Sequence, residues 1–175
     1  APGLALEKNG KAAILLPGPP FEMQTMFERS VRPWLARRAD HVLVSHTIHL
    51  HGIGESAVEY RLRERMEKGK NPTIAPYAKQ GEVQLRITAA APTREAADAL
   101  IRPEIDAICA ELREYVYGVD IGNQETALVE LLRQKHAKIA TAESCTGGLL
   151  SKRITDVAGA SEVFEFGVCT YANRM

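Results

Sequence analysis

The residues with the clearest chemical potential lie in the run Thr141–Gly148, which reads Thr-Ala-Glu-Ser-Cys-Thr-Gly-Gly. The short, mostly apolar stretch 137–142 is typical of a buried strand, and Leu149–Thr155 carries apolar residues at helical spacing. The turn between such a strand and helix lies at the carboxyl end of a sheet, where open α/β sheets bind ligands. Ser144 stands at the top of this turn, so the pattern is that of a nucleophile elbow without the Gly-x-Ser-x-Gly spelling.

The polar residues and glycines of this run have two interpretations. In a plain strand–turn–helix, Ser144 would only cap the helix, because Ser and Gly are common in such turns. In a binding turn, Gly147 and Gly148 would let the backbone approach a ligand, and amides at the helix start would attract an anion or a developing oxyanion. Thr146 and the two glycines fit an oxyanion and a nucleotide phosphate equally well. Glu143 fits a general acid or base, and equally a residue that neutralises a cation or interacts with the helix start.

Cys145 competes with Ser144 as the nucleophile, since a thiol is intrinsically more nucleophilic than a hydroxyl. Either group needs activation, most simply by a base that takes its proton. The motif contains no histidine that could activate Cys145, and the nearest one upstream, His136, precedes the predicted strand. This pattern favours the serine.

Three blocks of the sequence resemble the CinA (competence/damage-inducible protein) family in their order and spacing. They read Ala-Glu-Ser-Cys-Thr-Gly-Gly at 142–148, Thr-Asp-Val-Ala-Gly-Ala-Ser at 155–161 and Val-Cys-Thr-Tyr-Ala-Asn at 168–173. The C-terminal domain of that family is a nicotinamide-nucleotide amidohydrolase, which serves pyridine nucleotide recycling. The resemblance covers the start of this domain.

The resemblance implies a mechanism and a set of site residues. Ser144 would attack the carboxamide of nicotinamide mononucleotide, release ammonia and leave an acyl-enzyme for water to hydrolyse. Tyr171 matches the tyrosine of the family's Tyr-x-x-x-x-Lys segment, whose lysine is expected immediately after Met175. Without the resemblance, Tyr171 fits a core tyrosine equally well. The amidase is expected to need no cofactor and no metal. The implied substrate-binding residues are Glu143, Thr146, Gly147, Gly148 and Ser161, although Ala160 replaces the serine usually seen before Ser161.

Composition narrows the class of protein and of partner. The 175 residues include 22 basic and 22 acidic ones, so no net charge favours nucleic acid or an acidic membrane. No apolar run approaches the ~20 residues of a membrane span, and no signal peptide is visible. Three cysteines without ligand-like spacing fit a reducing cytoplasm better than a disulfide framework. We therefore expect a cytoplasmic protein. Because the sequence lacks an initiator Met and stops abruptly, we also expect it to be a piece of a longer protein.

Residues 1–43 are predicted to be the tail of a first domain. Lys11–Leu16 is typical of a short buried strand, and apolar side chains recur at helical intervals over Phe21–Leu35, where we expect them to pack in a core. Ala1–Gly3 and Leu16–Met23 resemble the closing motifs of the molybdopterin-binding-like domain that begins CinA proteins. That domain is associated with ADP-ribose pyrophosphatase activity and a divalent metal. Most of it is missing from this sequence, so we expect no such activity here.

Residues 44–119 are predicted to form a complete α+β domain. Its elements should run strand, helix, strand, strand, helix, which suggests helices on one face of a small sheet. This order resembles the KH-like middle domain of the CinA family. Pro103 should kink or restart the second helix. The expected elements cover Val44–His51, Glu55–Lys68, 72–77, Glu82–Ala89 and 93–115, with a turn over Lys79–Gly81.

Two other interpretations of this middle domain are disfavoured. His49 and His51 should point to one face of their strand and His46 to the other, with no carboxylate or cysteine beside them at the spacing of a zinc site. The sequence Gly-Ile-Gly at 52–54 is one residue short of the Gly-x-x-Gly loop of RNA-binding KH modules. Residues 44–118 hold 10 basic and 11 acidic side chains, without the basic stripe that nucleic acid needs. A non-catalytic spacer that contributes a homodimer contact is the preferred alternative.

The last predicted domain, 120–175, is the opening part of the amidohydrolase. The stretch 116–123 is expected to be a hinge, and Asn123 to cap a helix over Gln124–Lys135. Leu128, Leu131 and Leu132 would form the core stripe of that helix. The predicted fold class is therefore a multidomain α+β and α/β fragment, in which an intact KH-like βαββα sandwich is flanked by partial α/β domains.

Overall fold

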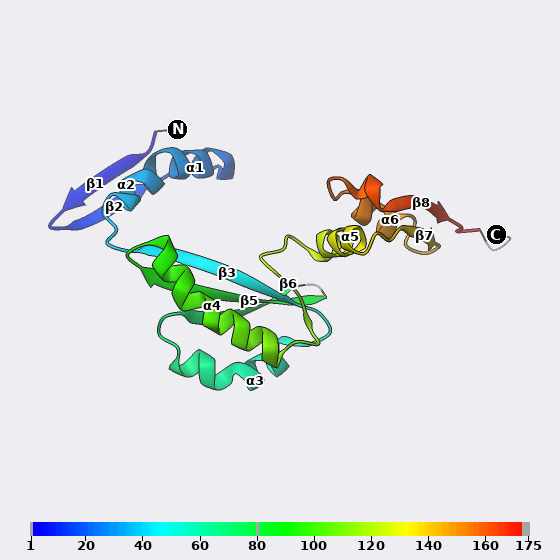
Figure 1. Cartoon of the computed structure of the whole chain (residues 1–175). Coiled ribbons are helices and arrows are strands. Elements are labelled where there is room, and N and C mark those ends of the chain that lie inside the picture. The colour runs from blue at the N-terminus through cyan, green and yellow to red at the C-terminus, as the bar shows by residue number, and fades with distance from the viewer. Residues whose placement is uncertain (1, 80, 173–175) are drawn as a thin grey trace.

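The computed structural model of the chain describes residues 2–79 and 81–172. The described strands form three separate sheets, with two, four and two strands, and these follow one another along the chain (Figure 1). Helices accompany each sheet, which confirms the predicted mixed α and β fold class. Ala1 of the first motif, Gln80 of the predicted turn and Asn173 of the third block lie outside the described residues, as does the position after Met175.

The N-terminal segment (residues 2–41) begins with an antiparallel hairpin of β1 (Leu4–Lys8) and β2 (Lys11–Leu15). Strand β2 was predicted, but its expected burial is wrong, because Leu15 is 55% exposed and no residue of the strand is buried. Strand β1 was not predicted. The helical stretch that follows is divided into α1 (Pro20–Met26), a π-helical turn η1 (Phe27–Val31) and α2 (Arg32–Ala36).

The expected core packing of this helical stretch is wrong within the described chain. Phe21 is 82% exposed, and Phe27 and Leu35 are also exposed. Among the described residues of α1, η1 and α2, only Val31 is buried. The physical reason is that the hairpin has only two short strands, and its own apolar side chains, such as Leu4 and Leu6, are exposed as well.

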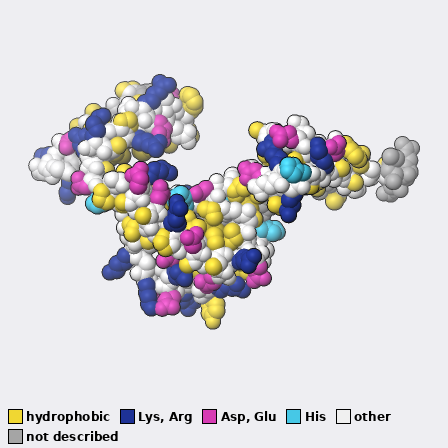
Figure 2. All heavy atoms as spheres, in the orientation of Figure 1, with side chains coloured by type: hydrophobic (Ala, Val, Ile, Leu, Met, Phe, Trp, Pro, Cys, Tyr) yellow, Lys and Arg dark blue, Asp and Glu magenta, His cyan; other side chains and the backbone are white. Residues whose placement is uncertain are grey.

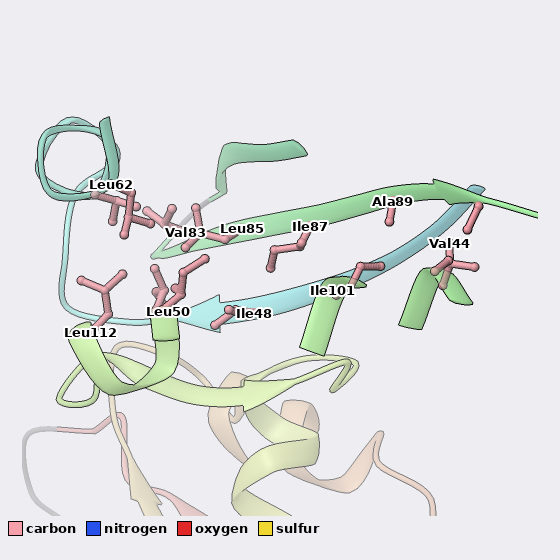
Figure 3. Close-up of a cluster of buried hydrophobic side chains, with 14 residues drawn as sticks. Val44, Ile48, Leu50, Leu62, Val83, Leu85, Ile87, Ala89, Ile101 and Leu112 are labelled. Carbon is pink, nitrogen blue, oxygen red and sulfur yellow. The ribbon is translucent and has the colours of Figure 1, made fainter. Parts of the chain in front are cut away.

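The middle unit (residues 42–119) is an antiparallel sheet in the order β4-β5-β3-β6, covered by two helices. Alternate residues of β5 face the core, and Figure 3 shows the buried side chains gathered around β3 and β5. Because α3 and α4 contribute to this same cluster, both helices cover one face of the sheet. The elements are β3 (Val42–Leu50), α3 (Glu55–Lys68), β4 (Thr73–Lys79), β5 (Glu82–Ala91), α4 (Arg94–Glu111) and β6 (Val116–Val119).

Two predictions for the middle unit need correction. Val116–Val119 is a fourth strand, not a hinge, and it pairs with β3, so the order is βαββαβ. Of the two outcomes expected at Pro103, a kink or a restart, the restart does not occur, because the second helix runs through Pro103; it ends at Glu111 and not at residue 115. Proline removes one backbone hydrogen bond of the helix, and the burial of Ile101 and Ile108 on either side offsets that loss.

The C-terminal unit (residues 120–172) contains a pair of parallel strands, β7 (Ile139–Glu143) and β8 (Phe164–Cys169). Helix α5 (Gln124–Gln134) begins as predicted, because the Asn123 side chain accepts a hydrogen bond from the Thr126 amide at 2.8 Å. Helix α6 (Leu149–Thr155) and the 3₁₀ turn η2 (Ala160–Glu162) lie between the two strands in the sequence.

The small core of this unit differs from the predicted one. Its buried residues are Val129, Ile154, Ala160 and Val163, with Leu128 and Leu132 packed against them. The expectation for Leu131 is wrong, because that side chain is 48% exposed. Strand β7 is half-buried instead of fully buried, and β8 was not predicted.

Two features of the whole chain bear on its possible partners. None of the described helices is long and apolar enough to cross a membrane. On the face shown in Figure 2, basic and acidic side chains are interspersed and do not gather in a stripe of one sign.

Candidate active site

The predicted strand–turn–helix is present, with β7 ending at Glu143 and α6 beginning at Leu149. The turn closes through two backbone hydrogen bonds, from the Gly147 amide to Ser144 O at 3.0 Å and from the Leu149 amide to Thr146 O at 3.1 Å. Gly147 and Gly148 have φ angles of 60° and 93°, in the left-handed region that favours glycine. A Cβ atom at either position would meet nothing within 4 Å, so these glycines serve the backbone conformation and not a close approach within this chain.

Ser144, Cys145 and Thr146 are all exposed on this turn. The serine hydroxyl is therefore open to a substrate from solvent, as an elbow nucleophile must be. The adjacent thiol is equally accessible, so exposure does not distinguish the two rivals.

Glu143, by contrast, is only 5% exposed and faces the start of α6. Its carboxylate accepts hydrogen bonds from the Ser151 hydroxyl at 2.6 Å and from the amides of Ser151 and Leu150, each at 2.8 Å. The Ser151 hydroxyl, followed by these amides and the Thr146 hydroxyl, lowers the pKa of Glu143 to about 2 against the opposing effect of burial. A carboxylate so acidic is a poor proton donor or acceptor near neutral pH, so the geometry favours the helix-start interpretation of this residue.

The position of Glu143 decides which amides of the turn are available to a ligand. Its oxygens occupy the amides of Leu150 and Ser151 in the first turn of α6. No described residue accepts a hydrogen bond from the amides of Cys145, Thr146 or Gly148. A developing negative charge would therefore be met by the turn and not by the helix start.

Tyr171 is brought to the same edge of the sheet as Ser144. Glu143 pairs with Cys169 in the parallel register, and the Thr170 amide donates to Glu143 O at 2.7 Å. Ser144 and Tyr171 each follow directly from this hydrogen-bonded pair, at the carboxyl ends of adjacent strands. Tyr171 is 74% exposed, so the alternative of a core tyrosine does not hold in this structure.

Ser161 is not brought to this turn. It lies exposed in η2, just before β8, and the Ile139 amide bonds to Val163 O at 2.7 Å at the amino edge of the strand pair. Ser144 stands at the carboxyl edge. Ser161 instead borders a depression formed by residues 155–161 and Phe164.

Three residues around the turn were missed by the sequence interpretation. Thr141 is buried, and its Oγ1 lies 2.6 Å from Ser151 Oγ on α6. Gly167 of β8 is the register partner of Thr141, and the two hydroxyls lie directly against it. Gly167 comes beside Thr141 through the pairing of β7 with β8, which was not predicted, whereas Ser151 reaches Thr141 from α6.

His46 and His49 of β3 and His51, which follows the strand, do not converge. His46 Nε2 lies 2.9 Å from Asp98 Oδ1, and His46 Nδ1 contacts Asp120 Oδ2. His49 and His51 form hydrogen bonds to uncharged groups. Within residues 2–79 and 81–172, no group of three or more His, Cys, Asp or Glu side chains is placed to hold a metal ion.

Comparison with known proteins places these observations in a family. Residues 45–118 match the damage-inducible protein CinA KH domain, and residues 122–175 match the CinA C-terminal domain. A CinA-like protein of Desulfovibrio desulfuricans is 50% identical over 175 residues, which are 99% of this chain and 41% of that protein. A CinA-like protein of Kosmotoga olearia is 48% identical over 174 residues, which are 99% of this chain and 42% of that protein. This sequence therefore spans about two-fifths of the length of the curated relatives that it matches. The chain belongs to the CinA family.

Proposed function

We propose that this chain carries the nucleophile of a nicotinamide-nucleotide amidohydrolase, with Ser144 in that role and nicotinamide mononucleotide as the substrate. The observation that supports this most is the hydrogen bond from the Thr170 amide to Glu143 O, because it joins the two strands at the point from which Ser144 and Tyr171 emerge. The family membership of residues 122–175 agrees with the proposal.

In the proposed reaction, Ser144 Oγ attacks the carboxamide carbon and its proton passes to a base. The base is Tyr171, assisted by the lysine expected after Met175. The base returns this proton to the amide nitrogen as the C–N bond breaks, so ammonia leaves. Water then hydrolyses the acyl-enzyme to nicotinate mononucleotide and restores the Ser144 hydroxyl. The unoccupied amides of Cys145 and Thr146 are suited to stabilise the oxyanion, since fixed donors at such a position are worth ~10²–10³ in kcat. A serine mechanism of this kind needs no cofactor.

The predicted substrate-binding residues differ in how well their positions agree with this function. Thr146, Gly147 and Gly148 belong to the turn that would face the substrate. Glu143 would not contact the substrate but would stabilise the turn through its hydrogen bonds to the start of α6. Ser161 would contact substrate only from another edge of the site. We propose the division 1–43, 44–119 and 120–175 for the domains, a homodimer as the assembly, and a divalent metal only for the pyrophosphatase-like domain that residues 1–43 resemble.

The test is the substitution Ser144→Ala in a full-length protein that contains this chain, assayed by ammonia release from nicotinamide mononucleotide. The change keeps the exposed turn intact because one small side chain replaces another, but it removes the atom that forms the acyl-enzyme. Loss of a covalent nucleophile in comparable hydrolases costs ~10⁶ in kcat. Unchanged binding of the nucleotide serves as the folding control, and a variant that still turns over substrate would overturn the proposal.

A further inference from the structure

A short chain of hydrogen bonds lies directly beneath the proposed nucleophile. Thr141 and Glu143 are alternate residues of β7, so both side chains lie on one face of the strand. Ser151 Oγ donates to Glu143 Oε1 at 2.6 Å and lies 2.6 Å from Thr141 Oγ1. Since its proton goes to the carboxylate, the Ser151 hydroxyl accepts the proton of Thr141. One side chain of α6 therefore ties together two of β7.

This network fixes both ends of the nucleophile turn. Glu143 is the residue immediately before Ser144, and Ser151 lies in the first turn of the helix that follows. The Glu143 carboxylate also holds the amides of Leu150 and Ser151. The five residues 144–148 are thus anchored at entry and exit to the same pair of oxygens.

Strand β8 packs directly against this network at Gly167. A Cβ atom at Gly167 would collide with Ser151 Oγ and lie 2.7 Å from Thr141 Oγ1, so the hydroxyls fill the space above this glycine. The titratable residue paired with Glu143 on β8 is Cys169. In the described part of the chain no cation forms an ion pair with Glu143, so neutral donors alone hold its charge.

We propose that Ser151 is a positioning residue for Ser144, whose hydroxyl joins Thr141 to Glu143 and so fixes the direction in which the turn presents the nucleophile. This inference rests on the proposed function. Its physical basis is that a displacement of about 1 Å at a reacting atom can cost about 10²-fold in rate while leaving binding nearly unchanged.

The experiment compares Ser151→Ala with Thr155→Val in the full-length protein. Thr155 is a matched control, because it also loses a hydroxyl from α6, but its hydroxyl bonds only to Ser151 O and Lys152 O. We expect Ser151→Ala to lower kcat by roughly 10–10²-fold with little change in KM, and Thr155→Val to alter neither. Thr141→Val, which leaves the bond from Ser151 to Glu143 in place, should show a smaller loss in the same direction.

A second readout does not depend on activity. Without the Ser151 hydroxyl, the pKa of the Glu143 carboxyl should rise from about 2 toward an ordinary carboxyl value. NMR titration of the Glu143 side-chain carbon in this 175-residue chain measures the change.

The outcomes separate this inference from the proposed function. Ammonia release by Ser144→Ala would refute both. If Ser144→Ala is inactive while Ser151→Ala matches Thr155→Val in kcat and in the pKa of Glu143, the proposed function stands and the positioning role of Ser151 is refuted.

Discussion

A thiol and a hydroxyl lie next to each other on the nucleophile turn, and both Ser144 and Cys145 are exposed. The turn places no histidine beside Cys145, and the chain reaches His136 before β7 begins. A thiolate mechanism would need such a partner or another cation to lower the thiol pKa.

We therefore expect Cys145→Ala to lower kcat by at most about 10²–10⁴-fold, the range for loss of an orienting group, and not by the ~10⁶ of a lost nucleophile. A Cys145→Ala variant that is inactive beside a Ser144→Ala variant that retains substantial activity would replace the serine mechanism with a thiolate one.

The residues of the site differ in how far the sequence alone could define them. The glycines and Ser144 were predictable because a strand, a turn and a helix are local patterns. Glu143 kept three interpretations, since its role depends on where its carboxylate points relative to the first amides of α6. Ser151 gave no signal, because a serine in a helix becomes significant only when the hydroxyls across from it are known.

Elements show the same division between local and non-local signals. Helices α3 and α6 have the predicted bounds, because their apolar spacing and flanking residues are read within the element itself. Strands β1, β6 and β8 were missed. Each has only four to six residues. Strands β6 and β8 are defined by pairing with strands distant in the sequence. Strand β1 instead pairs with β2 across the two-residue turn Asn9–Gly10, a local hairpin signal that the sequence interpretation overlooked. Alternation over so few residues is too weak to reveal a strand.

The pairing of β8 with β7 can be tested at Gly167. A methyl group at this position would collide with the Ser151 hydroxyl and crowd Thr141, so Gly167→Ala should force the two strands or α6 to shift. We expect a loss of about 1–3 kcal/mol in the free energy of unfolding, the usual cost of overpacking. Chemical denaturation of the C-terminal unit measures it.

Gly147→Ala is the informative comparison for that experiment. Its added methyl group would meet nothing within 4 Å, so any cost there comes from the positive φ angle alone. Combining Gly167→Ala with Ser151→Ala should recover part of the loss, because the second change removes the hydroxyl that the new methyl group meets. Purely additive effects would show that the crowding does not involve Ser151.

At the scale of the whole molecule, the middle unit and the C-terminal unit are joined at Asp120. This residue follows β6 with a left-handed φ of 55°, and its amide donates to Thr47 O at 2.8 Å. Its carboxylate accepts from the Thr47 amide at 2.8 Å and contacts His46 Nδ1. His46 Nε2 meets Asp98 of α4 on its other side. A neutral imidazole can donate from only one nitrogen, so two carboxylate partners favour the doubly protonated ring.

The contacts of His46 with Asp120 and Asp98 should therefore weaken as the pH rises. The hydrogen bonds that His46 donates to the carboxylates of Asp120 and then Asp98 raise the pKa of His46 above its ordinary value. A group whose pKa is raised on folding stabilises the fold fully below its unfolded pKa of about 6.5, and this contribution is lost as the pH climbs through the higher folded pKa. The pair is partly exposed, so we expect a contribution of only about 1 kcal/mol.

Asp120→Asn tests this joint without altering the backbone, because asparagine also tolerates a left-handed φ. The variant should be less stable than the parent chain by about 1 kcal/mol near pH 6, and the gap should close at higher pH as His46 loses its proton. Thermal unfolding between pH 5 and 9, at about one-unit steps, provides the comparison, since the carboxylates remain ionised over that range. Asp106→Asn is the control, because it removes a carboxylate of α4 that does not bond to His46, and its stability relative to the parent should show no such trend with pH. A gap between Asp120→Asn and the parent that stays constant across this range would mean that His46 holds Asp120 as a neutral ring and that the joint does not respond to pH.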